Sequence, residues 1–598
     1  MGREYRNAPS RTANGRPRLT CPAVEHAGGV ATGEIAVASG TRAPAVGTGS
    51  WRARLRCLAL PLGVVALACA LPLPELWRAP GAPMEEGFML VFPELVAEGM
   101  VPNRDFLHLY GPGSLWVLAG VYEVFGTTLA SERAVGVLQH LGVVFGVFAL
   151  VLPWGRWAAA AGAAVTAVVL VPTIGLTALA WTGAVALGLW SLYLLCVPAR
   201  RRWTTLLAGV LAGVALLYRP DLVVAIVLAV AAAWGPLGRS DRRRLAAGLA
   251  AGLAPYLVHL AMAGPGNVVR GLVIEPVFEL RPGRSLPFPP SWGHFDGFLQ
   301  KAGQLIEPDW PLPAPRSPAQ LGLWLALLFA SVALLVVAGA RAARAGRGRR
   351  LLVMGLFCVG LLPQAIQRAD STHLAWVSCV PLGFLPAAAA DLLCSWRPAW
   401  SRRRVTLVTA GLPVVATVVL APTFIWGIYT DYVGRSVGIG ELEQGTMRRG
   451  DRVFHYGRPD AVAAVTEMLP EVERISEPGD SLFVGTGDLR KTPYSEAYLY
   501  YLLPELEPAT HYIEMDPGIA NSPESGMADE LRAADVVILS SIRDDWDEPN
   551  DSRVFGPDEP NQVVEEHFCL VGSYGEGTFG RGLFELYERC GGAARTGG

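Results

Sequence analysis

The stretch RRRWTTLLAGVLAGVALLYRPDLVVAIVLAVAAAWGPLGRSDRRR, residues 200–244, decides the fold. Two apolar runs are joined by the short turn Arg219-Pro220-Asp221, and an arginine cluster flanks the pair on each side. A run of about 20 apolar residues crosses a bilayer as a helix, and arginine-rich loops stay on the cytoplasmic side. The stretch therefore predicts two membrane-spanning helices whose connecting turn lies outside.

The same pattern continues on both sides of this stretch. The 598-residue chain is 52% hydrophobic and only 17% charged, which favours a membrane protein. Its arginine clusters stand singly between apolar runs, as in membrane loops, which argues against nucleic-acid binding. The runs long enough to span, or nearly so, are 57–77, 133–153, 157–173, 176–198, 203–218, 221–237, 245–263, 319–340, 351–367, 373–395 and 405–428.

One further apolar segment, 113–126, is too short to be a secure span. If it crossed the membrane, every arginine cluster from residue 200 onward would lie outside; if it lies along the surface, all clusters lie inside. We therefore expect eleven spans and a juxtamembrane helix at 113–126. The clusters are Arg52/Arg54/Arg56, Arg156, Arg200–Arg202, Arg239/Arg242–Arg244, Arg341–Arg350 and Arg397/Arg402–Arg404.

This topology predicts three regions in a multi-pass protein of the plasma membrane. Residues 1–50 lack apolar periodicity and are expected to form a disordered cytoplasmic leader. Residues 51–430 form the membrane domain, with outer loops 78–132 and 264–318. Residues 431–598 form a soluble extracytoplasmic domain, so the candidate chemistry is expected on the outer side.

In the C-terminal region, apolar strand-like runs alternate with helical ones, as in an α/β domain. From Asp451 onward it holds 29 Asp and Glu but only 11 Lys and Arg. Cys569 and Cys590 would be able to form a disulfide if the region is extracytoplasmic. Strands are predicted in SLFVGTGD, THYIEM, ADVVILSS, HFCLVGSYG and GLFELYERC, and helices near 459–474, 494–503 and 525–534.

Glu85 and Glu86 follow the first span directly. Two adjacent carboxylates that are partly buried would not both ionise easily, unless a cation or a cationic side chain lay beside them. Such a pair suits a general base acting on a hydroxyl group, or a metal site. The alternative is a pair of acidic residues that caps the helix that follows.

The other candidates lie in the outer loop and turns. They combine carboxylates with arginine or histidine. Asp221, Asp370 and His373 are expected near the outer membrane boundary, where ionisable groups are costly unless paired or functional. Asp105 and His108 lie in the first outer loop, for which a solvated loop is the alternative, and Arg104 beside them is able to hold a phosphate with two hydrogen bonds. Plain loop ion pairs are the alternative for each Arg-x-Asp sequence. Loop 264–318 adds further arginines whose roles cannot be told from their spacing. The candidates are Arg104, Asp105, His108, Arg219, Asp221, Arg368, Asp370 and His373.

The order of these features resembles the GT-C superfamily of integral membrane glycosyltransferases. The likeness is strongest to the enzymes that use polyprenyl-phosphate sugars, the protein O-mannosyltransferases and aminoarabinose transferases of the family 39 type. It rests on Glu85-Glu86, where the family has Asp-Glu, on the passage EGMVPNRDFLHLYGPGSLWVLAGVYEVFG (98–126) leading to Arg133, and on the Arg-Pro-Asp turn. It covers roughly residues 55–240.

The resemblance implies an inverting transferase for a hexose or pentose. The sugar would pass from a polyprenyl-phosphate donor to a hydroxyl group of a glycan, protein or lipid. Glu85 would be the base, Glu86 would orient neighbouring groups or help to bind a metal, and Asp105 would be a further acidic residue of the site. Glutamate in place of aspartate at position 85 leaves open which carboxylate acts. The resemblance is compatible with a divalent cation as a cofactor, magnesium or manganese, but does not require one.

Two other classes of function remain open at this stage. A transporter or flippase of lipid-linked sugars would need ionisable groups near the middle of the bilayer, whereas the acidic residues of this chain gather at one surface. A non-catalytic anchor that displays a binding domain would not require the acidic motifs of the membrane part.

Overall fold

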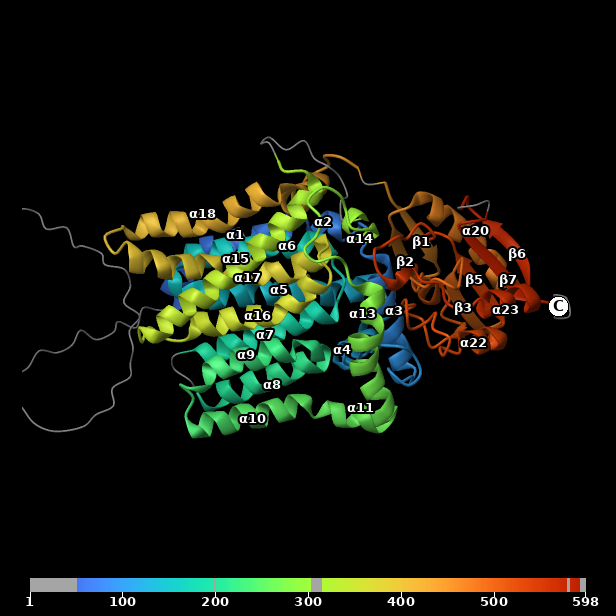
Figure 1. Ribbon diagram of the computed structural model, residues 1–598, viewed down its shortest axis with the longest axis horizontal. Coiled ribbons are helices and arrows are strands. Elements are labelled where there is room, and N and C mark those ends of the chain that lie inside the picture. The colour runs from blue at the N-terminus through green and yellow to red at the C-terminus, as the bar shows by residue number, and fades with distance from the viewer. Residues whose placement is uncertain (1–50, 198–200, 303–313, 442, 578–580, 592–598) are drawn as a thin grey trace, which may run out of the picture.

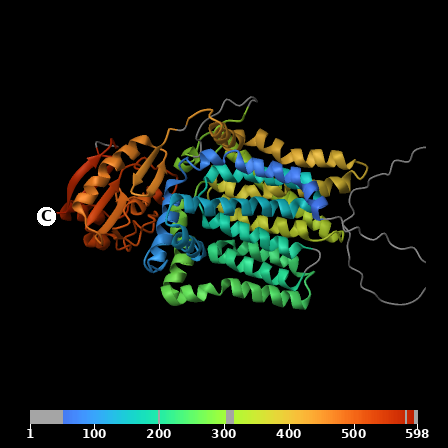
Figure 2. The same cartoon turned by 180° about the vertical axis from the view of Figure 1, so that it is seen from behind.

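The computed structural model describes residues 51–197, 201–302, 314–441, 443–577 and 581–591, with side chains from Cys57 onward. The leader expected over residues 1–50 lies outside this part of the chain. The remaining chain forms a long bundle of roughly parallel helices with a smaller α/β domain at one end (Figures 1 and 2).

The bundle contains the eleven helices expected from the sequence, counted over the described residues. Eight are long and apolar enough to cross a membrane, and three are shorter apolar helices. The protein is therefore a multi-pass membrane protein. The eight are α1 (Trp51–Ala70) with α2 (Leu73–Leu76), α5 (Leu129–Val151), α6 (Arg156–Ile174), α10 (Arg239–Leu253) with α11 (Pro255–Ala263), α15 (Ser317–Arg344), α16 (Arg350–Gln367), α17 (Ser371–Trp396) and α18 (Arg402–Leu420). The three are α7 (Ala180–Cys196), α8 (Arg202–Tyr218) and α9 (Val223–Trp234).

Short elements lie across one end of the bundle, between it and the α/β domain (Figures 1 and 2). The loop 78–132 supplies α3 (Pro83–Ala97) and α4 (Gly113–Phe125). The apolar segment 113–126 is thus a helix at the end of the bundle, as the arginine pattern predicted. The second loop supplies α12 (Pro265–Val269), the π-helical segment η3 (Arg270–Glu279), α13 (Leu280–Arg284) and α14 (Phe298–Ala302).

The C-terminal domain is built on a five-stranded sheet with the order β4-β3-β5-β7-β6. Strand β3 (Ser481–Thr486) pairs in parallel with β4 (Glu507–Pro508) and β5 (Val536–Ser540). Strand β7 (Phe584–Arg589) runs antiparallel to β5 and to β6 (Phe568–Tyr574). The domain also contains the hairpin β1 (Gly445–Arg449) and β2 (Arg452–Tyr456), and helices α20 (Pro459–Ile475), α21 (Tyr498–Leu502), α22 (Met527–Ala533) and α23 (Glu559–His567). Helix α19 (Ile428–Ser436) connects it to the bundle.

Four of the five predicted strands are confirmed, and so is the disulfide between Cys569 and Cys590, whose Cα atoms are 5.1 Å apart. The strand predicted in THYIEM, residues 510–515, is wrong. Its backbone bonds elsewhere: the N–H of His511 donates to Glu530, and the carbonyl of His511 accepts from Leu107 of the first outer loop at 2.8 Å. This segment therefore joins the domain to the membrane part instead of extending the sheet.

Helix α3 packs directly against the C-terminal domain. A Cβ atom at Gly87 would lie 2.8 Å from the backbone nitrogen of Tyr498, so only glycine permits this close approach. Farther along α3, Glu94 accepts two hydrogen bonds from Arg452, at 2.7 and 2.8 Å. The start of α3, which carries Glu85 and Glu86, is consequently fixed by both halves of the molecule.

Candidate active site

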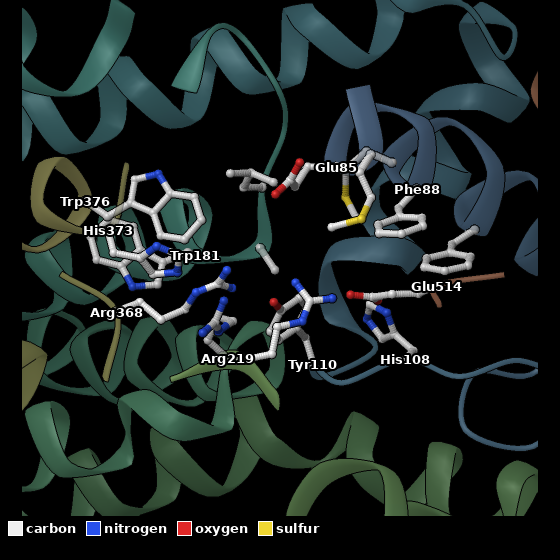
Figure 3. Close-up of a pocket in the computed structure, with 16 residues that line it drawn as sticks. Glu85, Phe88, His108, Tyr110, Trp181, Arg219, Arg368, His373, Trp376 and Glu514 are labelled. Atoms are coloured by element: carbon white, nitrogen blue, oxygen red, sulfur yellow. The ribbon is translucent and has the colours of Figure 1, made fainter. Parts of the chain in front are cut away.

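A cavity lies where the bundle, its end loops and the C-terminal domain meet (Figure 3). It contains about 670 Å³ of space free of protein atoms, part of it open to solvent. Its charged and polar lining comes from six different parts of the chain. These residues are Glu85, His108, Arg219, Arg284, Arg368, His373 and Glu514, with aromatic walls from Phe88, Phe92, Tyr110, Trp181 and Trp376.

Glu85 in the first turn of α3 points into this cavity (Figure 3). The N-cap residue of α3, Ala82, forms no side-chain capping hydrogen bond, and Glu85 and Glu86 lie in the first turn, where the helix dipole favours acidic residues, in line with the alternative given for this pair. Within the described residues, the Glu85 carboxylate forms no hydrogen bond and no ion pair of its own. It is therefore available to a ligand in the cavity.

Glu86 faces the opposite way. Its carboxylate accepts two hydrogen bonds from Arg133, at 2.8 and 2.9 Å, and both side chains are almost fully buried. Arg133 also donates to the carbonyl oxygens of Leu76, Trp77 and Ala79. The structure places Glu86 outside the cavity, where it ties the end of the first span to α3 and α5.

Arg219 lines the cavity and is oriented by its neighbours. Asp221 accepts two hydrogen bonds from it, at 2.9 and 2.8 Å, and Gln364 donates a further one to Asp221 at 2.8 Å. The guanidinium group also lies 4.1 Å from the ring centroid of Tyr110, a cation–π distance. Asp221 is thus the support of Arg219 and does not itself line the cavity.

Arg284 and Arg368 add two more positive charges. Arg284 of α13 is buried and forms an ion pair with Asp516 of the C-terminal domain. Burial and the nearby charge of Arg368 lower the pKa of the Arg284 guanidinium. The Nε atom of Arg368 is buried without a hydrogen-bond partner among the described residues. Three guanidinium groups in one cavity favour an anionic ligand such as a phosphate.

His373 lies at the start of α17, opposite Glu85 in the cavity (Figure 3). Asp370 caps this helix by accepting from the backbone N–H of His373 at 3.0 Å, and its other oxygen lies 2.8 Å from Nδ1 of the same residue. The His373 ring packs on Trp376, which in turn stacks on Trp181. Asp370 therefore orients His373, and the rings of His373, Trp376 and Trp181 close this side of the cavity.

His108 is fully enclosed between Phe92 and Tyr110. Burial is the main cause that lowers the pKa of His108 to about 3. It is neutral at any physiological pH and contributes a polar but uncharged wall.

Glu514 reaches the cavity from the C-terminal domain (Figure 3). Burial raises its pKa to about 7, and the negative charge of Glu85 adds to this rise, whereas Arg284 and Arg219 oppose it. Glu514 is absent from the residues predicted from the sequence, because the composition of Tyr-Ile-Glu-Met favours a strand. The available signal was a lone carboxylate inside an otherwise apolar run.

The loop residues Arg104 and Asp105 lie outside the cavity lining. They pair with each other through two hydrogen bonds, at 2.8 and 2.7 Å, and Asp105 also accepts from the N–H of Val101. This pair engages both side chains within the loop, whereas the ion pair expected as the alternative for the Arg-x-Asp sequences forms between Arg219 and Asp221. Their part in the chemistry stays a prediction.

A divalent cation does not fit the cavity well. Magnesium and manganese prefer several oxygen ligands, but here two carboxylates face three guanidinium groups. Among the described residues no group of three or more His, Cys, Asp or Glu side chains is close enough to hold a metal ion. We therefore assign no chemical step to a metal.

The fold and this cavity define a multi-pass membrane protein with a charged site at the junction of bundle and soluble domain. No protein-family model and no curated protein matches the chain. Among solved structures, it is similar to ArnT from Cupriavidus metallidurans bound to undecaprenyl phosphate, at 14% identity over 89% of this chain and 98% of that one, with a TM-score of 0.49.

Archaeal oligosaccharyltransferase AglB from Archaeoglobus fulgidus, in complex with an inhibitory peptide and a dolichol-phosphate, is similar at 11% identity over 87% of this chain and 73% of that one, with a TM-score of 0.46. The same oligosaccharyltransferase in complex with Zn and sulfate has a TM-score of 0.41, at 11% identity over 87% of this chain and 73% of that one. A likeness this distant says nothing about substrate or mechanism, which have to be argued from the residues of this chain.

Proposed function

We propose that the protein transfers a sugar from a polyprenyl-phosphate donor to a hydroxyl acceptor. The observation that carries this proposal is the Glu85 carboxylate, which has no hydrogen-bond or ion-pair partner among the described residues, in a cavity that also holds Arg219, Arg284 and Arg368. A free carboxylate and an arginine cluster are what a base and a phosphate-leaving-group site require. The position of the cavity at the end of a membrane bundle suits a donor whose lipid tail stays in the bilayer.

Glu85 acts as the general base in this mechanism. It accepts the proton of the acceptor hydroxyl as the acceptor oxygen attacks the anomeric carbon of the sugar. Attack from the face opposite the phosphate inverts the anomeric configuration. Because α3 is fixed by Gly87 and by the Glu94–Arg452 pair, the base is held in place before the substrate binds.

The arginines handle the phosphate. Their donors stabilise the negative charge that grows on the phosphate oxygens as the bond to the sugar breaks. Arg219 is already oriented by Asp221 and Tyr110, so orienting its guanidinium group costs no further free energy when the reaction takes place. The buried Nε of Arg368, which lacks a partner among the described residues, gains one when the phosphate is bound.

We place the cavity and the C-terminal domain on the extracytoplasmic side. The arginine clusters support this orientation through the positive-inside rule. The Cys569–Cys590 disulfide supports it independently, because disulfides persist in oxidising compartments. Acceptors of the cell envelope, whether glycan, protein or lipid, would then be within reach of the site.

The test is transfer of radiolabelled sugar from a panel of hexosyl and pentosyl undecaprenyl phosphates in proteoliposomes. Glu85→Gln is expected to lower transfer by about 10²–10⁴-fold, whereas Glu98→Gln, at the exposed C-cap of α3 outside this cavity, retains it. Wild-type transfer rates in Glu85→Gln would overturn the active-site assignment. Movement of the labelled donor across the bilayer without any covalent change would instead identify a flippase.

A further inference from the structure

We propose that Glu514 is a second catalytic residue, which protonates the departing polyprenyl phosphate. This inference rests on the proposed function and deepens it. Glu514 belongs to the C-terminal domain, so the domain would supply part of the reaction machinery in addition to any role in binding the acceptor.

The position of Glu514 is the first argument. It lines the same cavity as Glu85, and its backbone segment is anchored to the first outer loop by the His511–Leu107 hydrogen bond of 2.8 Å. Two residues further on, Asp516 pairs with Arg284 of the cavity. The carboxyl group is thus fixed beside the arginines that would hold the phosphate.

The Glu514 carboxyl group forms neither a hydrogen bond nor an ion pair within the described parts of the chain, although the residue is only 7% exposed. A buried carboxyl group without a partner is costly, which is typical of a residue retained for function. Asp516, by contrast, already neutralises Arg284, so Glu514 is not needed as its counterion.

Burial and the charge of Glu85 favour the protonated form of Glu514, whereas Arg284 and Arg219 oppose it. The cavity that Glu514 enters is also lined by His108 and Tyr110 from the first loop, by Arg368, and by His373 from α17. Burial raises the pKa of Glu514 to about 7. The second pKa of a phosphate monoester is about 6, so the two groups are matched for proton transfer near neutrality.

The step balances without any further reactant. The bond between the anomeric carbon and the phosphate oxygen breaks, its electron pair stays on that oxygen, and the phosphate takes the proton of Glu514. The acceptor oxygen forms the new bond to the anomeric carbon, and its proton passes to Glu85. The products are the glycosylated acceptor, singly charged polyprenyl phosphate, protonated Glu85 and ionised Glu514. Exchange of one proton with solvent at each carboxyl group restores the starting state.

The experiment compares pH profiles of wild type and Glu514→Gln on the undecaprenyl-phosphate sugar that the wild type turns over. We expect wild-type kcat/KM to fall above about pH 7 and Glu514→Gln to lose this dependence, with kcat reduced about 100-fold near pH 6.5. A non-bridging phosphorothioate donor yields a product that is a weaker base. On this donor the kcat of the variant should lie within about tenfold of the wild-type kcat.

The control is Asp544→Asn. Burial raises the pKa of Asp544 to about 6, but this residue lies outside the cavity in the same domain, so its replacement should leave both profiles unchanged. If Glu514→Gln does not fold, Glu514→Asp serves instead and should keep the alkaline decline at a reduced rate. Equal losses on both donors, or an alkaline decline that persists in Glu514→Gln, would overturn the acid role alone. A wild type that transfers no sugar from any donor would overturn the proposed function and this inference together.

Discussion

Glu86 and Arg133 form a buried ion pair joined by two hydrogen bonds, while the neighbouring Glu85 turns into the cavity. Two adjacent carboxylates thus serve opposite purposes. One is neutralised and holds the architecture, and the other is left free for chemistry.

Loss of the Glu86–Arg133 pair is expected to destabilise the protein. Glu86→Gln leaves the buried guanidinium uncompensated, which costs about 3–5 kcal/mol. Arg133→Met should cost more, because three backbone carbonyls also lose their donor. Thermal unfolding in detergent, monitored by the exposure of buried cysteines, measures the loss of stability. Glu85→Gln, with unchanged stability, is the matched control. A variant of Glu86 with wild-type stability would contradict the structural role.

Glu85→Gln should act on turnover alone. Removal of a general base lowers kcat by about 10²–10⁴-fold, and the apparent KM for donor should stay within a factor of a few, because the arginines are untouched. Glu85→Asp, which restores the aspartate usual in the resembling family, should recover part of the rate. The steady-state parameters for transfer decide this. A large rise in KM with unchanged kcat would instead make Glu85 a binding residue.

Asp221→Asn is expected to affect donor binding more than turnover. Asp221 supplies both hydrogen bonds that orient Arg219, so its replacement frees the guanidinium to adopt other rotamers. We expect donor affinity to fall roughly tenfold, since a charge-assisted contact contributes about 1.5–3 kcal/mol and only part of it is lost. Binding of undecaprenyl phosphate measured by calorimetry tests this. Asp241→Asn, in the first turn of α10, where Asp241 pairs with Arg244 outside the cavity lining, is the control.

The sequence predicted the membrane architecture because that architecture depends on local properties. Apolar length and arginine position are readable residue by residue, and they placed all eleven helices as well as the surface segment 113–126. Glu85, His108, Arg219, Arg368 and His373 were also found, since each interrupts or follows an apolar run. All five line the one cavity.

Pairings between distant residues could not be predicted in this way. Nothing local distinguishes Glu86 from Glu85; the difference arises from Arg133, 47 residues away. The strand wrongly assigned to THYIEM has the right composition for a strand, but the segment bonds to Glu530 and to Leu107 of another region. Glu514 and Arg284 reach the cavity only because of these long-range contacts.

His108 should make folding sensitive to acid. Its pKa is about 3 in the folded protein against an ordinary 6.5, so the unfolded chain binds the extra proton between these values. Stability is therefore full above about pH 6.5 and falls by up to about 1.4 kcal/mol per pH unit as the pH decreases toward 3. His108→Phe, which keeps an aromatic ring between Phe92 and Tyr110, should flatten this decline in melting temperature. Replacement of the exposed His567 by Gln is the control, and an unchanged decline in His108→Phe would contradict the assignment.

The disulfide offers a test of both stability and orientation. Cys569 and Cys590 join β6 to the end of β7 across a sequence separation of 21, a loop whose closure contributes about 2–4 kcal/mol. Serine at both positions should destabilise the C-terminal domain, which limited proteolysis of the full chain would detect.

In intact cells a membrane-impermeant maleimide should label this domain only after reduction by an impermeant reductant, if the domain is extracytoplasmic. Cys569→Ser alone leaves Cys590 free and should be labelled without reduction. Labelling that requires permeabilised cells would place the domain, and the cavity beneath it, on the cytoplasmic side.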